Sequence, residues 1–74
     1  MAVLGEGSAG SEVAKLQAQL QELGFNPGLI DGRFGPATEA AVLAFQKWVG
    51  LTPDGVLGPM TRARLSTALE RLKA

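Results

Sequence analysis

The chain has 74 residues, with seven Lys plus Arg against seven Asp plus Glu, and it contains neither His nor Cys. A chain of this length forms one small domain with a thin core, which leaves little room for an enclosed catalytic cavity. Because zinc sites, thiol nucleophiles and Ser–His relays rely on His or Cys, and because zero net charge disfavours a nucleic-acid partner, we expect a non-catalytic chain without a cofactor.

The first ten residues are predicted to form a flexible entry (1–10) to a single domain that spans residues 1–74. Gly and Ser dominate residues 5–11, a composition typical of flexible segments. The start of the chain has no basic residue followed by an apolar run, so it lacks the pattern of a signal peptide. No stretch reaches the roughly 18 apolar residues needed to cross a bilayer, so no membrane span is expected.

The first helix is predicted over about residues 11–23, with Ser11 as a candidate N-cap. Gly24 should end it in the left-handed conformation, which lets Phe25 fold back on the last turn. The apolar residues of this segment recur at helical spacing and form one stripe on an otherwise polar cylinder: Val13, Leu16, Leu20 and Leu23.

The second helix is predicted over about residues 36–49, after a structured loop at residues 26–35. Gly35 followed by Pro36 suits an N-cap and a first helical residue, because Pro lacks the N–H that would have no partner there. Gly50 should end this helix as Gly24 ends the first. Its inward face is expected to consist of Ala41, Val42, Phe45, Trp48 and Val49.

The third helix is predicted over about residues 59–72 and follows a repeated entry. Residues 31–38 and residues 54–61 agree at five of eight positions, with an offset of 23 residues. The chain is therefore predicted to be all-α: a compact three-helix bundle with an internal partial repeat and Asp-Gly-x-x-Gly loops before helices two and three. The third helix is expected to turn inward Leu65, Ala68, Leu69 and Leu72.

The repeated Asp-Gly-x-x-Gly element has a mechanical interpretation as a loop brace. Asp can accept hydrogen bonds from backbone N–H groups two or three residues on, and both glycines can take positive φ. A calcium loop would need an acidic residue at its twelfth position, but Val42 stands there when counting from Asp31, so no metal site is expected. The predicted structural loop braces are Asp31, Gly32, Gly35, Asp54, Gly55 and Gly58.

Several side chains allow both a structural and a binding interpretation. Gln17 and Gln46 each follow a core position directly, and bracing of loop backbone is favoured over a place in a groove. Phe34 and Trp48 fit either the core or a platform for sugar stacking. The basic residues of segment 59–74 form either a solvated face or an anion site: Arg62, Arg64, Arg71 and Lys73.

As an ordered set, the recurring residues resemble the small peptidoglycan-binding domain of the PG-binding-1 type, which is found beside cell-wall hydrolase domains. The resemblance covers about residues 8–69. It implies a three-helix bundle without catalysis of its own, which targets an attached hydrolase or envelope protein to peptidoglycan. The motifs that carry it are Gly10-x-x-Val13-x-x-Leu16-Gln17-x-x-Leu20, Leu23-Gly24-Phe25, Asp31-Gly32-x-Phe34-Gly35-x-x-Thr38, Ala41-Val42-x-x-Phe45-Gln46, Gly50-Leu51 and Asp54-Gly55-x-Leu57-Gly58-x-x-Thr61-x-x-x-Leu65.

This resemblance leads to expectations about the site and the partners. Arg33 and Arg62 are expected to pair with ligand carboxylates, Phe34 to make an apolar contact, and Thr38 and Gln46 to hydrogen bond ligand amides. The partners would be peptidoglycan, through its glycan or its stem peptide, and a fused catalytic domain, with the chain a monomer. Its place would be the cell envelope or the exterior, as part of an exported parent, with a phage lysin as an alternative origin.

Two other functions remain open from the sequence. A protein-interaction or pro-domain-like module would pack on a neighbouring catalytic domain, with Trp48 as its anchor. The same unit also resembles the propeptide module of some matrix metalloproteinases, although their cysteine switch has no counterpart in a chain without Cys. A helix-turn-helix nucleic-acid binder is opposed by the zero net charge and by the length of the loop at residues 54–58.

Overall fold

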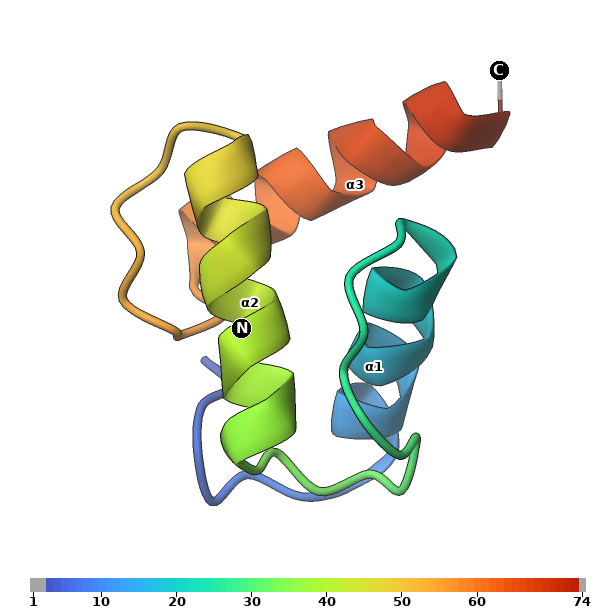
Figure 1. Cartoon of the computed structure of the whole chain (residues 1–74), viewed down its shortest axis with the longest axis vertical. Coiled ribbons are helices and arrows are strands. Elements are labelled where there is room, and N and C mark those ends of the chain that lie inside the picture. The colour runs from blue at the N-terminus through green and yellow to red at the C-terminus, as the bar shows by residue number, and fades with distance from the viewer. Residues whose placement is uncertain (1–2, 74) are drawn as a thin grey trace.

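Three helices arranged around one core make up most of the chain (Figure 1). The computed structural model describes residues 3–73 and contains α1 (Ser11–Glu22), α2 (Pro36–Trp48) and α3 (Pro59–Lys73). No strand occurs in this described range, so the all-α three-helix class is confirmed. None of the helices there has the length and apolarity to cross a bilayer. Predictions about residues 1, 2 and 74 lie outside the described residues.

The helices begin where the sequence places their starts. Pro36 and Pro59 open α2 and α3, and Gly35 caps α2 in an extended conformation without a side-chain hydrogen bond. The cap of α1 differs from the prediction, because Gly10 and not Ser11 is the N-cap. The carbonyl of Gly10 accepts the first helical hydrogen bond, from Ala14 N–H at 3.2 Å, so Ser11 is already inside the helix.

Both α1 and α2 end through a left-handed glycine, as predicted. Gly24 has φ 94° and Gly50 has φ 80°. In each case the N–H of the residue after the glycine donates to the carbonyl five residues before it, Leu20 O in α1 and Gln46 O in α2, both at 2.8 Å. This pairing satisfies carbonyls that the helix end leaves without partners, so each glycine stops its helix at a defined residue.

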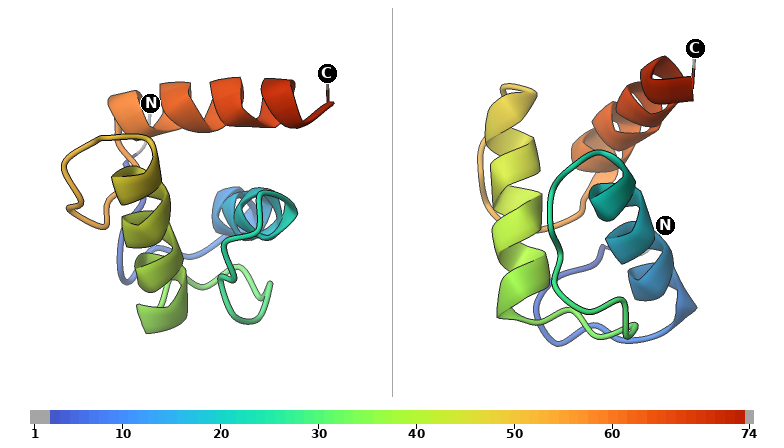
Figure 2. Two further views of the ribbon diagram at one scale, coloured as in Figure 1. Left: turned by 45° about the horizontal axis from the view of Figure 1, so that its top comes forward. Right: turned by 45° about the vertical axis from the view of Figure 1, so that its right-hand side comes forward.

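The core lies between the inward faces of the helices. Two predicted core residues are instead exposed, Trp48 by 66% and Leu72 by 50%. Trp48 is the last residue of α2 and lies off its buried stripe, and Leu72 belongs to the end of α3 that projects past the other helices (Figure 2). The buried apolar residues are Leu4, Val13, Leu16, Leu20, Phe34, Ala41, Val42, Phe45, Leu57 and Leu65.

The segment predicted as a flexible entry is packed against the domain over its described residues 3–10. Leu4 is buried and exchanges two backbone hydrogen bonds with Leu57, at 3.2 and 2.7 Å. Gly10 N–H donates to Gly32 O at 2.9 Å. The segment is packed and not a flexible entry, because its small residues let its backbone run beside both Asp-Gly loops and pair with them.

Candidate functional site

Gln17 joins α1 to the first Asp-Gly loop and to the start of α2. Its Nε2 donates to Arg33 O at 2.9 Å, to Thr38 Oγ1 at 3.0 Å and to Asp31 Oδ1 at 3.2 Å. Its Oε1 accepts from Gly32 N–H at 2.9 Å. Only 1% of Gln17 is exposed, so this single side chain satisfies the polar groups of a buried loop corner.

Gln46 makes the corresponding bonds between α2, the second Asp-Gly loop and the start of α3. Its Nε2 donates to Asp54 Oδ1 at 2.8 Å, to Val56 O at 3.0 Å and to Thr61 Oγ1 at 3.1 Å. Its Oε1 accepts from Gly55 N–H at 2.9 Å. The two networks therefore match atom for atom, and each ties one helix to the entry of the next.

This geometry corrects the prediction that Thr38 and Gln46 hydrogen bond a ligand. Their exposed fractions are 2% and 1%, and their polar atoms already have partners inside the protein. A ligand would have to break a satisfied buried network to reach them, which costs more than a surface contact returns. The bracing role that the sequence favours for the two Gln residues is the one their contacts show.

The carboxylates of Asp31 and Asp54 act as acceptors inside their own loops. Arg33 N–H donates to Asp31 Oδ1 at 2.9 Å, and Val56 N–H donates to Asp54 Oδ1 at 3.0 Å. These backbone bonds, followed by the Gln side-chain bonds, hold the pKa of both carboxyls below the usual value. A lowered pKa does not suit a general acid at neutral pH. Across residues 3–73, no group of three His, Cys, Asp or Glu side chains could hold a metal ion.

The lowered pKa values predict a loss of stability in acid. In the folded state the pKa values of Asp31 and Asp54 lie below the ordinary value of 3.8. The stability that these two carboxylates contribute is therefore fully present above that pH. It is lost as the pH falls below 3.8 and through the folded pKa. Thermal unfolding followed by circular dichroism should show this fall, and the double variant Asp31→Asn, Asp54→Asn should show a shallower one. An equally steep fall in the double variant would contradict this origin.

Only the first glycine of each Asp-Gly-x-x-Gly element needs a left-handed backbone. Gly32 and Gly55 both have φ 75°, and a Cβ on Gly32 would lie 3.1 Å from the carbonyl oxygen of Gly10. Gly35 has φ −112°, and Gly58 does not have positive φ either. The positive φ that both glycines can take is therefore used only at the first glycine of each element, because the second stands in front of a helix and not within the turn.

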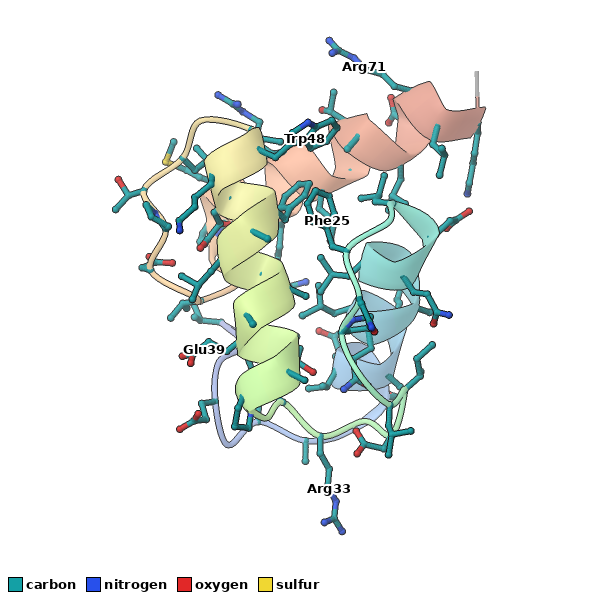
Figure 3. All side chains as sticks on the ribbon, in the orientation of Figure 1. Phe25, Arg33, Glu39, Trp48 and Arg71 are labelled. Atoms are coloured by element: carbon teal, nitrogen blue, oxygen red, sulfur yellow. The ribbon has the colours of Figure 1, made fainter. Side chains whose placement is uncertain are left out.

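The structure separates the remaining predicted site residues. Phe34 is 2% exposed and belongs to the core, so it cannot make the predicted apolar contact with a ligand. Arg33 is exposed and points away from the body of the protein (Figure 3). Neighbours in an extended segment face opposite sides, which explains the difference between these two residues. Arg62 lies elsewhere, beside α1.

A groove between α1 and α3, here called the α1–α3 groove, contains Arg62 and has a volume of about 380 Å³. Arg62 Nη2 lies 3.5 Å from Glu12 Oε2, so the guanidinium forms an ion pair with a carboxylate of α1. Basic and acidic side chains line the groove together with apolar ones, a combination that suits a ligand with both carboxylates and amines. The floor is formed by Leu16, Leu57, Leu65 and Leu69, and the charged rim by Glu12, Lys15, Arg62, Glu70 and Lys73.

A second groove, here called the Trp48 groove, lies between the end of α2 and the outer face of α3 and has a volume of about 460 Å³. The sequence flags Trp48 and the basic residues Arg64 and Arg71 separately but does not bring them together. Arg64 and Arg71 are seven residues apart and so share a face of α3. This spacing in the sequence could have predicted that the two side chains lie together. The groove is lined by Trp48, Val49, Arg64, Thr67, Ala68 and Arg71.

Comparison with known proteins gives a consistent result. The family model PG_binding_1, described as "Putative peptidoglycan binding domain", matches residues 9–65. The chain is 52% identical over 52 residues to the N-acetylmuramoyl-L-alanine amidase CwlM of Mycobacterium tuberculosis, covering 70% of this chain and 13% of the amidase. Other curated relatives are likewise longer, and the chain spans 54% and 24% of the next two.

Solved structures share the same fold. The N-terminal domain of SleB superposes with a TM-score of 0.87 at 39% identity, covering 90% of this chain and 92% of that one. A Burkholderia AP3 phage endolysin superposes with a TM-score of 0.84 at 43% identity, covering 88% of this chain and 25% of the endolysin.

Proposed function

This chain belongs to the PG_binding_1 family of peptidoglycan-binding domains, and from that membership we propose that it is a non-catalytic module that holds an attached hydrolase or envelope protein on the cell wall. Its similarity to an amidase and to an endolysin supports the attachment to a hydrolase. The parent would act in the cell envelope or outside the cell, and a phage lysin is an alternative parent. The module itself would work as a monomer.

The observation that carries the proposal is the α1–α3 groove. Stem peptides of peptidoglycan present free carboxylates, amides and, in many walls, an amine. Arg62 and Lys73 on the rim can pair with carboxylates, while Glu12 and Glu70 can accept from an amine. The leucine floor below them removes ligand methyl groups from water.

Arg33 has a separate place in the proposal. Because it projects from the first Asp-Gly loop, outside the α1–α3 groove, it would meet another part of the same polymer. Each exposed contact of this kind is weak by itself. Retention on the wall would therefore come from many repeat units and from more than one contact.

We also infer that the two Gln-centred networks are copies of one structural unit. Each copy uses a Gln on one helix, an Asp-Gly turn and a Thr in the first turn of the next helix. Such a unit sets the angle between successive helices and so gives the grooves a defined shape. This unit would correspond to the internal partial repeat that the sequence predicts, with a scaffold role.

Co-sedimentation with purified sacculi tests the proposed function. The wild-type chain should pellet with sacculi, and the double variant Arg62→Gln, Lys73→Gln should bind about five- to tenfold more weakly, with the difference shrinking at high salt. Lys47→Gln is the matched control, because Lys47 is exposed on α2 and lies in neither groove. Recovery of all folded wild-type chain in the supernatant would overturn the proposal.

A further inference from the structure

Trp48 packs against two aromatic rings although most of it faces solvent. Its ring centroid lies 5.7 Å from that of Phe25 and 6.3 Å from that of Phe45, with interplanar angles of 55° and 49°. Figure 3 shows Trp48 at the end of α2, beside Phe25 and α3. An exposed fraction of 66% leaves a large apolar face in water, and an aromatic side chain with only two rotatable bonds loses little conformational entropy when a ligand covers it.

The side chains around Trp48 carry charge of one sign. Both ionisable groups of the Trp48 groove are guanidinium groups, Arg64 and Arg71, whereas the α1–α3 groove has a mixed rim. Arg64 Nη1 donates to Val49 O at 2.7 Å, so this guanidinium is tied to the end of α2. Arg71 projects outward from α3 (Figure 3). The groove therefore combines a flat aromatic face with a cationic edge and favours an anionic ligand.

We propose that the Trp48 groove is a saccharide subsite for an N-acetylated amino sugar that bears a carboxylate. The indole would stack on the apolar face of the sugar ring, and Arg71, supported by Arg64, would pair with the carboxylate. The inference rests on the proposed function, because peptidoglycan supplies both groups on one strand: alternate sugars carry a lactyl acid, whose carboxylate is free wherever the stem peptide has been removed from it.

The position of the two grooves on α3 strengthens this assignment. Arg64 and Arg71 lie on one face of the helix, and Arg62 and Lys73 line the groove on the other side. One strand could then place a sugar against Trp48 while a stem peptide occupies the α1–α3 groove. Two weak contacts with the same polymer give an overall affinity higher than that of either contact alone.

Tryptophan fluorescence tests the subsite directly, because Trp48 is the single Trp of the chain. Titration with the disaccharide N-acetylglucosaminyl-N-acetylmuramic acid, which has a free lactyl carboxylate, should change the emission saturably. The neutral disaccharide of N-acetylglucosamine should bind at least about threefold more weakly, and Arg71→Gln should remove this preference. Unchanged emission with the acidic disaccharide at millimolar concentration, or an equal response to both sugars, would overturn the subsite.

Sacculus binding separates the failure of the subsite from the failure of the proposed function. Trp48→Leu should weaken co-sedimentation about tenfold, whereas Met60→Ala, at a residue of similar exposure outside both grooves, should leave it unchanged. If the wild type pellets and Trp48→Leu pellets equally, the subsite is wrong and the wall-binding function stands. If the wild type does not pellet, both proposals fall.

Arg71→Gln covers the case in which Trp48→Leu disturbs the fold. Arg71 is exposed in the last turn of α3, so its replacement leaves the core intact. The sacculi for this test are first treated with an amidase, which removes stem peptides and frees the lactyl carboxylates. A folded Arg71→Gln variant that binds these sacculi about threefold more weakly supports the subsite, and unaltered binding counts against it.

Discussion

Replacement of Gln17 by Leu is expected to lower the free energy of unfolding by about 4 kcal/mol, because Leu has nearly the same size but cannot hydrogen bond. The change removes the acceptor of Gly32 N–H and the Gln17 amide donor to Thr38 Oγ1 and Asp31 Oδ1. A domain of 74 residues has a total stability of about 4 to 11 kcal/mol, so this loss approaches the whole in the less stable case. Urea denaturation followed by circular dichroism measures it.

Gln21→Leu is the matched control for this prediction. Gln21 lies on the same helix, but its side chain is exposed, so the change should alter the free energy of unfolding by no more than about 0.5 kcal/mol. Gln46→Leu should behave like Gln17→Leu, because Gln46 makes the corresponding bonds in the second network. A Gln17→Leu variant within about 1 kcal/mol of the wild type would show that the network is dispensable.

Phe45→Ala is the second change with a large expected effect, a loss of about 3 to 5 kcal/mol in the free energy of unfolding. Phe45 is 1% exposed, and its ring packs edge-on against Phe25 with centroids 5.7 Å apart. Truncation removes most of the apolar surface that α2 contributes at this level and leaves a cavity that the three helices cannot close. Thermal and urea unfolding of the purified variant provide the measurement.

The variant Trp48→Ala tests whether burial or aromatic contact accounts for the stability loss expected of Phe45→Ala. The ring of Trp48 lies against Phe25 and Phe45, with centroids 5.7 and 6.3 Å away, but 66% of Trp48 already faces solvent. Its loss should therefore cost no more than about 1.5 kcal/mol of stability, although it should weaken wall binding. Equal stability losses for Phe45→Ala and Trp48→Ala would mean that ring contacts and not burial hold this cluster together.

The residues that recur in the sequence build the scaffold, and the charged groove rims come from other positions. Gln17, Thr38 and Gln46 stand in the family motif and are buried in the hydrogen-bond networks. Of the residues that line the α1–α3 groove, the motif supplies only part of the leucine floor. Both the charged rim and all of the Trp48 groove lie outside it. A search for ligand contacts among the motif residues therefore points toward the interior.

Local rules explain what the sequence determines without the tertiary structure. Pro36 and Pro59 open helices and Gly24 and Gly50 close them, because these effects depend on the backbone of each residue and on partners within one turn. The Asp-Gly turns follow for the same reason, since their first hydrogen bond reaches only two residues along the chain.

Only the tertiary structure decided which side chains are available to a ligand. Phe34 is buried and Trp48 is exposed, although the sequence allows either place for both. Leu4 enters the core because it pairs with a loop residue more than fifty positions away. Burial depends on which elements meet, and elements distant in the chain meet through the sum of many weak contacts. The spacing of apolar residues along one helix does not carry this information, so the helices followed from the sequence but the exposed grooves did not.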